Sequence, residues 1–204
     1  MDFWNSQLTE KSWKLLQKLR EKYNFILIGG WAAYLWTKQQ KSKDIDIVAG
    51  IAELQNLKQE HLSKNDSLKK YEIKFEEVDV DIYVPYFSKL SIPPQDLCRY
   101  ASKTEGFNVV MPEALLVLKQ GAETDRENSV KGEKDRLDIV SLLFFSELDL
   151  KKYILILKKY SLEDFVERLI SILRNFTGYN SLNLAPRELK LKKEKVLRSL
   201  KGLR

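Results

Sequence analysis

The sequence predicts an α+β fold, in which a β-sheet with flanking helices is followed by a C-terminal helical region. Three observations support it: a short apolar run ending in Gly29-Gly30, two later segments that alternate charged and apolar residues, and a succession of helical patterns after residue 113. Strict alternation is typical of a half-buried strand, whereas apolar residues every three or four positions indicate a helix. We expect a core domain over residues 1–125 and a helical region over residues 126–204.

The strands are expected in the first half of the chain. The run FILI at 25–28 is short and wholly apolar, and the two glycines after it lead into strong helix formers. Two later segments, 43–49 and 71–84, alternate charged and apolar residues, as half-buried strands do. In order, we expect a helix over 9–23, a strand over 25–28, a glycine turn, a helix over 31–36, a strand over 43–49, a helix over 51–64 and a long strand or hairpin over 71–84.

The second half is expected to be helical after one more strand. Pro85, Pro93 and Pro94 mark a loop-rich crossing, and Pro112 suits the first turn of a helix. We expect a strand over 107–110, helices over 113–122, 133–148, 149–159, 161–175 and 187–201, and a loop over 176–186.

Cysteine and histidine content excludes two kinds of site. With one cysteine, Cys98, and one histidine, His61, the chain can form neither an internal disulfide nor a Cys/His zinc site. The N-terminus lacks the pattern of a signal peptide, and no apolar stretch approaches the length of a membrane span. We therefore expect a cytoplasmic protein without a membrane partner.

The excess positive charge lies at the C-terminus. Residues 187–204 hold eight Lys and Arg against two Glu, which accounts for the net charge of +6, because the rest of the chain has 27 basic and 27 acidic side chains. Its leucines recur at helical spacing, so we expect a docked amphipathic helix. Its lysines could bind a phosphate-rich acceptor such as tRNA, or could simply form a solvated outer face.

The Gly29-Gly30 pair is a candidate phosphate-binding turn. Glycine permits a tight turn between strand and helix and leaves backbone N–H groups free to approach an anion. Taken alone, the pair is better explained as a plain strand-to-helix turn, because short glycine motifs are common.

Asp44 and Asp46 are candidate metal ligands. They are two residues apart on an expected strand, so their carboxylates project from one face with Cα atoms about 7 Å apart. Mg²⁺ prefers carboxylate and phosphate oxygens, and two like charges on one strand face repel each other without a cation. The later strand adds Glu77, Asp79 and Asp81 on one face, where a third ligand could lie; a solvent-exposed face is the alternative.

The order of these parts resembles the DNA polymerase β-type nucleotidyltransferase superfamily. That signature is a hydrophobic residue, Gly, then Gly or Ser, a spacer, and Asp-hydrophobic-Asp/Glu; here 13 residues separate Gly30 from Asp44-Ile45-Asp46. The stretches 111–119 and 134–139 resemble the small prokaryotic branch, which includes minimal nucleotidyltransferases and AbiEii-type toxins. The resemblance implies a mixed β-sheet.

The resemblance also implies residue roles. Gly29 and Gly30 would hold the phosphates of a nucleoside triphosphate such as ATP, and Asp44 and Asp46 would bind two Mg²⁺ ions. Asp81 would complete the metal site, with Asp79 as the alternative. Lys119, Lys134 and Arg126 are candidate contacts to the phosphates or the acceptor. Lys134 lies four residues before Asp138, so a surface ion pair explains it equally well.

Two functions follow as hypotheses. The first is a Mg²⁺-dependent transferase that moves a nucleoside monophosphate from an NTP to a hydroxyl of tRNA or other RNA, a protein or a small molecule, with release of pyrophosphate. The second is a catalytically silent binding or regulatory module, including one that serves as a partner in a toxin–antitoxin pair. The chain has no G-x-G-x-x-G or Walker-type glycine motif, and its single histidine lies in a polar segment unsuited to a catalytic triad.

Overall fold

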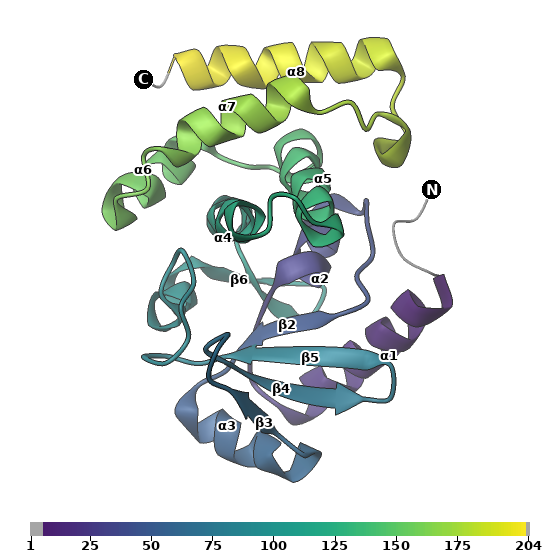
Figure 1. Ribbon diagram of the computed structural model, residues 1–204, viewed down its shortest axis with the longest axis vertical. Coiled ribbons are helices and arrows are strands. Elements are labelled where there is room, and N and C mark those ends of the chain that lie inside the picture. Colours follow the sequence, from purple (N-terminus) through teal and green to yellow (C-terminus); the bar gives the residue numbers. More distant parts are fainter. Residues whose placement is uncertain (1–5, 203–204) are drawn as a thin grey trace. The chain divides into compact units, whose positions relative to one another are not determined.

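A seven-stranded mixed sheet is the centre of the first half of the chain (Figure 1). The structure is a computed structural model that describes residues 6–202; residues 1–5 and 203–204, which belong to the expected core domain and basic tail, lie outside the described residues. Contacts divide the chain into two compact units, Asp2–Met111 (the sheet unit) and Pro112–Arg204 (the helical unit). The expected α+β fold class with a mixed sheet is confirmed, and the domain boundary at residue 125 stays a prediction.

The strand order in the sheet is β3-β4-β5-β2-β1-β7-β6. Strand β2 is antiparallel to β1 and parallel to β5, and β1 is parallel to β7. The sheet unit contains α1 (Ser6–Lys22), β1 (Ile26–Ile28), α2 (Gly29–Thr37), β2 (Ile45–Val48), α3 (Ile51–Leu57), β3 (Ser63–Asn65), β4 (Lys70–Phe75), β5 (Val78–Tyr83), β6 (Ala101–Thr104) and β7 (Phe107–Val110).

Alternation along the central strands separates a buried apolar face from a polar face. Ile45, Ile47 and Ile82 are fully buried, whereas the aspartates between them are less buried. Burying such side chains stabilises the fold by roughly 1.5–3 kcal/mol each. The alternation that predicted these strands therefore also decides which side chains face away from the core.

An aromatic cluster joins α1 and α2 to the sheet. The rings of Trp13 and Trp31 lie 5.0 Å apart, and Trp13 lies 5.7 Å from Phe107 of β7. The buried indole N–H of Trp31 donates to Ser12 Oγ over 2.8 Å. These contacts anchor α2, the helix that follows Gly29, within the sheet unit.

The acidic segment 71–84 forms a hairpin, which was one of the two alternatives. Strands β4 and β5 are antiparallel with Phe75 opposite Val78, so only Glu76 and Glu77 form the turn. Glu76 has a φ of 52°, in the left-handed region common in such turns. This short turn fixes the register of the hairpin.

The helical unit consists of α4 (Pro112–Asp125), α5 (Val130–Phe145), α6 (Leu150–Tyr160), α7 (Phe165–Asn175) and α8 (Pro186–Lys201). Each corresponds to an expected helix with shifted ends. Its core includes Leu115, Ile139, Leu157 and Leu173, all fully buried. None of the helices within residues 6–202 is both long and apolar enough to cross a membrane.

Two details differ from the sequence prediction. The helix expected over 51–64 ends earlier: α3 stops at Leu57, a short 3₁₀ turn follows, and Ser63–Asn65 form edge strand β3. Strand β6 was not expected either. Both strands are short and polar, and backbone pairing with a neighbouring strand creates them.

Candidate active site

The glycine turn joins β1 directly to α2. Gly29 has a φ of +68°, which side-chain-bearing residues rarely adopt, and α2 begins at this residue. The residue before it, Ile28, offers no side-chain cap to the helix. The first N–H groups of α2 therefore form the positive end of the helix dipole, an arrangement suited to an anion.

Gly29 lies directly against the side chain of Asp46. Strands β1 and β2 pair with Ile28 opposite Asp46, which brings the turn beside the aspartate. A Cβ atom on Gly29 would lie 2.1 Å from Asp46 Oδ2 and 2.6 Å from Asp46 Cγ. The carboxylate of Asp46 thus occupies the space that a side chain at position 29 would need.

We expect Gly29→Ala to lower the free energy of unfolding by at least about 1–2 kcal/mol, because alanine is disfavoured at this φ and its Cβ would displace Asp46. Urea unfolding followed by circular dichroism measures the change. Gly50→Ala is the matched control, since its Cβ would have nothing within 4 Å and its φ is −69°. Equal stability of the two variants would contradict the close contact.

Asp46 and Asp81 are neighbours across the sheet. The parallel pairing of β2 with β5 sets Asp46 opposite Asp81, with Cα atoms about 4.8 Å apart and side chains on one face. Asp44 precedes β2 and lies two residues before Asp46. Asp79 lies two residues before Asp81 and is exposed. In the strand register it lies opposite Lys74 of β4. The sheet register therefore brings the predicted aspartates and the glycine turn into one region.

Lys70 is a polar neighbour of this region that the sequence interpretation missed. Its Nζ lies 2.7 Å from Asp81 Oδ2 and 3.0 Å from Glu72 Oε1, and its side chain is only 13% exposed. The hairpin register explains the contact, because Glu72 lies opposite Asp81 and Lys70 is two residues from Glu72 on the same face. A two-residue turn at Glu76-Glu77 was the signal that could have revealed it.

The ion pairs of Lys70 shift two pKa values. Burial alone would lower the pKa of Lys70, but its hydrogen bonds to Asp81 and Glu72 outweigh burial and raise the pKa. The hydrogen bond from Lys70 lowers the pKa of Glu72. Lys70 is therefore a fixed positive charge beside Asp81.

The aspartates fit Mg²⁺ in their chemistry. Among residues 6–202, no three His, Cys, Asp or Glu side chains are gathered closely enough to hold a metal ion by themselves. Mg²⁺, however, is usually held by one or two carboxylates together with substrate phosphates and water. Asp44 and Asp46 supply such carboxylates, and the start of α2 lies against Asp46.

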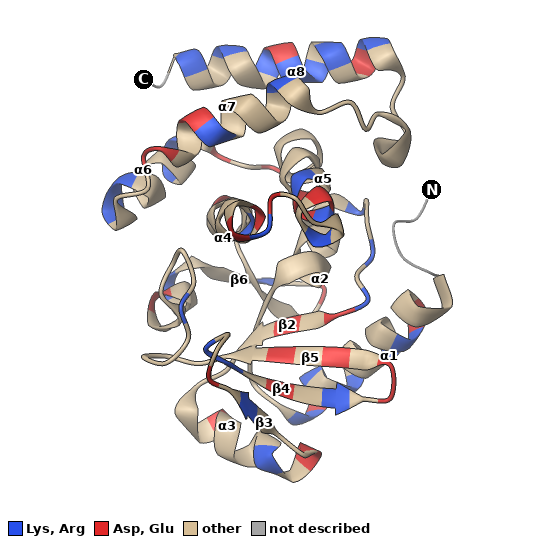
Figure 2. Ribbon diagram, in the orientation of Figure 1, with Lys and Arg blue, Asp and Glu red and all other residues tan. Residues whose placement is uncertain are grey.

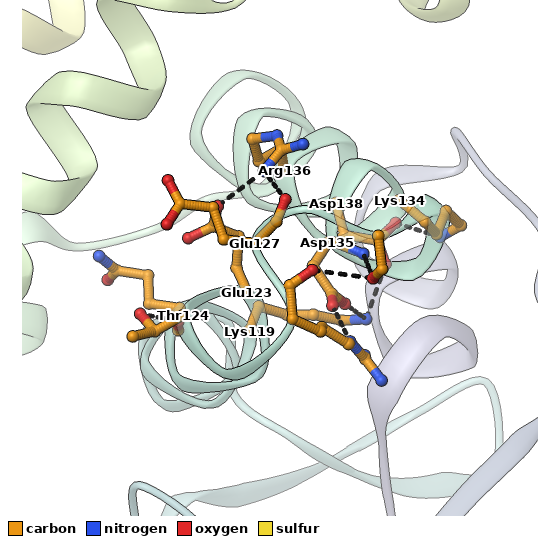
Figure 3. A network of polar contacts seen from close by, with 12 residues as sticks. Lys119, Glu123, Thr124, Glu127, Lys134, Asp135, Arg136 and Asp138 are labelled. Carbon is orange, nitrogen blue, oxygen red and sulfur yellow. Dashed lines mark hydrogen bonds and ion pairs between the residues drawn. The ribbon is translucent and has the colours of Figure 1, made fainter.

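Lys119 and Lys134 belong to a buried ion-pair network of the helical unit (Figure 3). Lys119 Nζ on α4 lies 3.0 Å from Asp135 Oδ1 and 2.8 Å from Asp138 Oδ2 on α5. Lys134 pairs with Asp138, and Arg126 Nε lies 2.6 Å from Asp135 Oδ2. These five side chains carry three positive and two negative formal charges. The expectation of a surface pair between Lys134 and Asp138 is wrong in location, because both side chains are buried.

Burial changes the acid–base properties of this network. Desolvation lowers the pKa of Lys134, which Asp138 opposes and the nearby charge of Lys119 reinforces. Burial would raise the pKa of Asp135, but the charge of Lys119 and the hydrogen bond from Arg126 prevail, so its pKa is lowered. The contacts of Lys119 and Lys134 with a nucleotide stay predictions.

A second group of ion pairs continues the network. Glu123 is 1% exposed and accepts from Arg136 at 2.9 Å and from Arg168 of α7 at 2.9 and 3.0 Å. Arg168 also lies 3.0 Å from Glu127. Because every charge in this group has a partner, it is best explained as a link that holds α4, α5 and α7 together.

Comparison with solved structures identifies the fold. JHP933 from Helicobacter pylori matches with a TM-score of 0.55 and 17% identity, over 97% of this chain and 95% of that one. An H. pylori protein described as a putative nucleotidyltransferase matches with the same score and identity, over 98% and 99%. The chain has a nucleotidyltransferase fold. No protein-family model and no curated protein sequence matches it.

The comparisons extend across both units of the nucleotidyltransferase fold, since each covers nearly the whole chain. The candidate site residues are identified from the sequence and geometry of this chain alone. Membership of the AbiEii-type branch stays a prediction.

Proposed function

We propose that the chain is a Mg²⁺-dependent nucleotidyltransferase that moves a nucleoside monophosphate from an NTP to an acceptor hydroxyl. The acceptor oxygen forms a bond to the α-phosphorus, the bond from that phosphorus to the bridging oxygen of the β-phosphate breaks, and pyrophosphate leaves. The observation that carries this proposal is the sheet register, which sets Asp46 opposite Asp81 with Gly29 packed against Asp46.

Gly29 and Gly30 would bind the triphosphate. Their N–H groups lie at the positive end of α2, and the absence of a side chain at position 29 leaves room for Asp46 beside the phosphates. Asp44 and Asp46 would hold Mg²⁺, which when bound neutralises phosphate charge and stabilises the attacking and leaving oxygens.

Asp81 would orient the acceptor hydroxyl and take its proton. It lies across from Asp46, and Lys70 Nζ lies 2.7 Å from its Oδ2, which holds the carboxylate in place. Lys70 is thus a positioning residue for Asp81. Lys119, Lys134 and Arg126 would contact the phosphates or the acceptor; of the three, Arg126 has the most exposed side chain, at 40%.

We expect Asp81→Asn to lower transfer about a hundredfold, since removal of a general base typically costs this much or more. Asp79→Asn should retain activity within about twofold, because Asp79 is exposed, whereas Asp81 is half-buried opposite Asp46. Steady-state rates of both variants with the same acceptor distinguish the two candidates. Loss of activity in Asp79→Asn alone would reverse the assignment.

A second candidate function rests on the Lys70–Asp81 ion pair. Lys70 offsets the repulsion between the aspartates without a metal ion, so the acidic face is compatible with a silent binding or regulatory module, including one partner of a toxin–antitoxin pair. Such a module would keep the fold and lack transfer.

Labelled transfer distinguishes the two functions. The purified full chain is incubated with Mg²⁺ and each α-labelled NTP in the presence of RNA, protein or metabolite fractions. The enzyme is expected to release pyrophosphate and to add the mass of one nucleoside monophosphate to an acceptor, which mass spectrometry identifies. Absence of transfer in every fraction would favour the silent module.

A further inference from the structure

A groove lies within the helical unit, between the C-terminal end of α7, the loop over residues 176–186 and α8. Its volume is about 370 Å³. Its lining combines apolar, aromatic and mainly basic side chains, among them Arg174, Phe176, Tyr179, Leu189, Lys190 and Leu197, with Glu194 as the acidic member. The aspartate site and the buried network use none of these residues.

Local contacts hold the walls of this groove in place. A Cβ atom at Gly178 would lie 2.8 Å from the Phe176 ring, so the loop packs closely against that ring. Lys193 of α8 donates hydrogen bonds to the backbone carbonyls of Arg174 at 2.8 Å and Phe176 at 3.0 Å. Lys193 therefore fastens α8 to the end of α7, and the groove is preformed.

The groove has an apolar interior and a basic rim. Phe176, Tyr179 and Leu197 are half-buried, whereas Arg174 and Lys190 are exposed. Helix α8 carries seven Lys and Arg against two Glu, and Figure 2 shows blue segments along its whole length. A ligand that fits must therefore combine a flat or apolar group with several negative charges.

We propose that this groove binds a single-stranded polynucleotide, with one base against Phe176 and Tyr179 and neighbouring phosphates on Arg174, Lys190 and the remaining basic residues of α8. Aromatic side chains beside a basic surface are the means by which proteins bind single strands without reading their sequence. A role of this polynucleotide as the acceptor rests on the proposed function. Its binding to the groove is independent of that function.

The size of the groove favours a base over a protein partner. About 370 Å³ is near the lower limit of small-ligand sites, which suits one ring system. A helix of an acidic partner would instead need a longer groove with anchor positions over several turns. The spread of basic residues along α8 matches a chain of phosphates.

Fluorescence anisotropy of the full-length protein with labelled 12-nucleotide single strands tests the proposal. RNA and DNA strands form separate arms, and a duplex and inorganic polyphosphate serve as competitors at several salt concentrations. We expect single strands of at least one kind to bind, and to compete better than the duplex or polyphosphate, because only an unpaired base can enter the groove.

Variants separate the contribution of the base from that of charge. Tyr179→Ala is expected to weaken binding about tenfold, and Tyr179→Phe to restore it, since the ring is retained. Arg174→Ala combined with Lys190→Ala should reduce the slope of log affinity against log salt by about 1.4. The matched control, Lys151→Ala combined with Lys152→Ala, removes two exposed lysines from α6. It should leave the advantage of single strands over the duplex and polyphosphate nearly unchanged.

Three results would overturn the proposal. These are absence of oligonucleotide binding, equal competition by polyphosphate, or unchanged binding in a folded Tyr179→Ala variant. Binding of an acidic amphipathic peptide in place of oligonucleotides would assign the groove to a protein partner. None of these measurements needs NTP or Mg²⁺, so the outcome is independent of the proposed transfer reaction.

Discussion

Asp46→Asn is expected to lower nucleotidyl transfer by on the order of 10³-fold or more while leaving the chain folded. The substitution keeps the shape of the side chain but removes a metal-binding carboxylate, and metal stabilisation of a transition state contributes several kcal/mol. Asp46 lies opposite Asp81, so loss of its charge also relieves repulsion on that face. Initial rates at saturating Mg²⁺ measure the loss, and thermal unfolding is expected to show unchanged or increased stability.

The control for this variant is Glu77→Gln, which removes an acidic charge from the exposed hairpin turn. Glu77 forms an ion pair with Lys11 over 2.7 Å, and both side chains are exposed. Its activity is expected to match that of the wild type. An active Asp46→Asn variant, or one that is inactive because it unfolds, would contradict the role of Asp46 as a metal ligand.

Asp135→Asn is expected to lower the free energy of unfolding by about 3–5 kcal/mol. Asp135 is 1% exposed and is the partner of both Lys119 and Arg126, so its neutralisation leaves Asp138 as the remaining carboxylate for the three basic side chains. Urea unfolding followed by circular dichroism measures the loss. Because its pKa is lowered in the folded state, its contribution is present above the unfolded pKa of about 4 and disappears as the pH falls through the folded pKa.

Asp66→Asn is the matched control for this effect. Asp66 forms an ion pair with Lys64 at 2.8 Å, and both side chains are exposed. Its replacement should leave stability nearly unchanged, since exposed pairs contribute little. A small effect in Asp135→Asn at pH 7, equal to that of Asp66→Asn, would show that the buried network does not stabilise the helical unit.

Local sequence patterns were sufficient to predict the centre of the fold. The run at 25–28, the glycines after it and the alternation around Asp46 each act within a few residues, so composition and period determine them. The sheet register then brings them together. The close contact of Gly29 with Asp46 is the structural reason for glycine at that position.

The parts that the sequence did not predict depend on distant partners. Strands β3 and β6 are short and polar, and pairing with β4 and β7 makes them strands. Lys70 meets Asp81 only once the hairpin register is set. Lys134 and Asp138 have the spacing of a surface pair, and they are buried because Lys119 of α4 packs against the same aspartate.

Calorimetric titration with a non-transferable NTP analogue tests the central claim most directly. We expect the wild-type chain to bind at least one of the four analogues in Mg²⁺, to lose binding when the metal is chelated, and to bind at least tenfold more weakly after Asp46→Asn. Wild-type protein that binds no analogue in a Mg²⁺-dependent manner would contradict the assignment of Gly29, Asp44 and Asp46 to a nucleotidyltransferase active site.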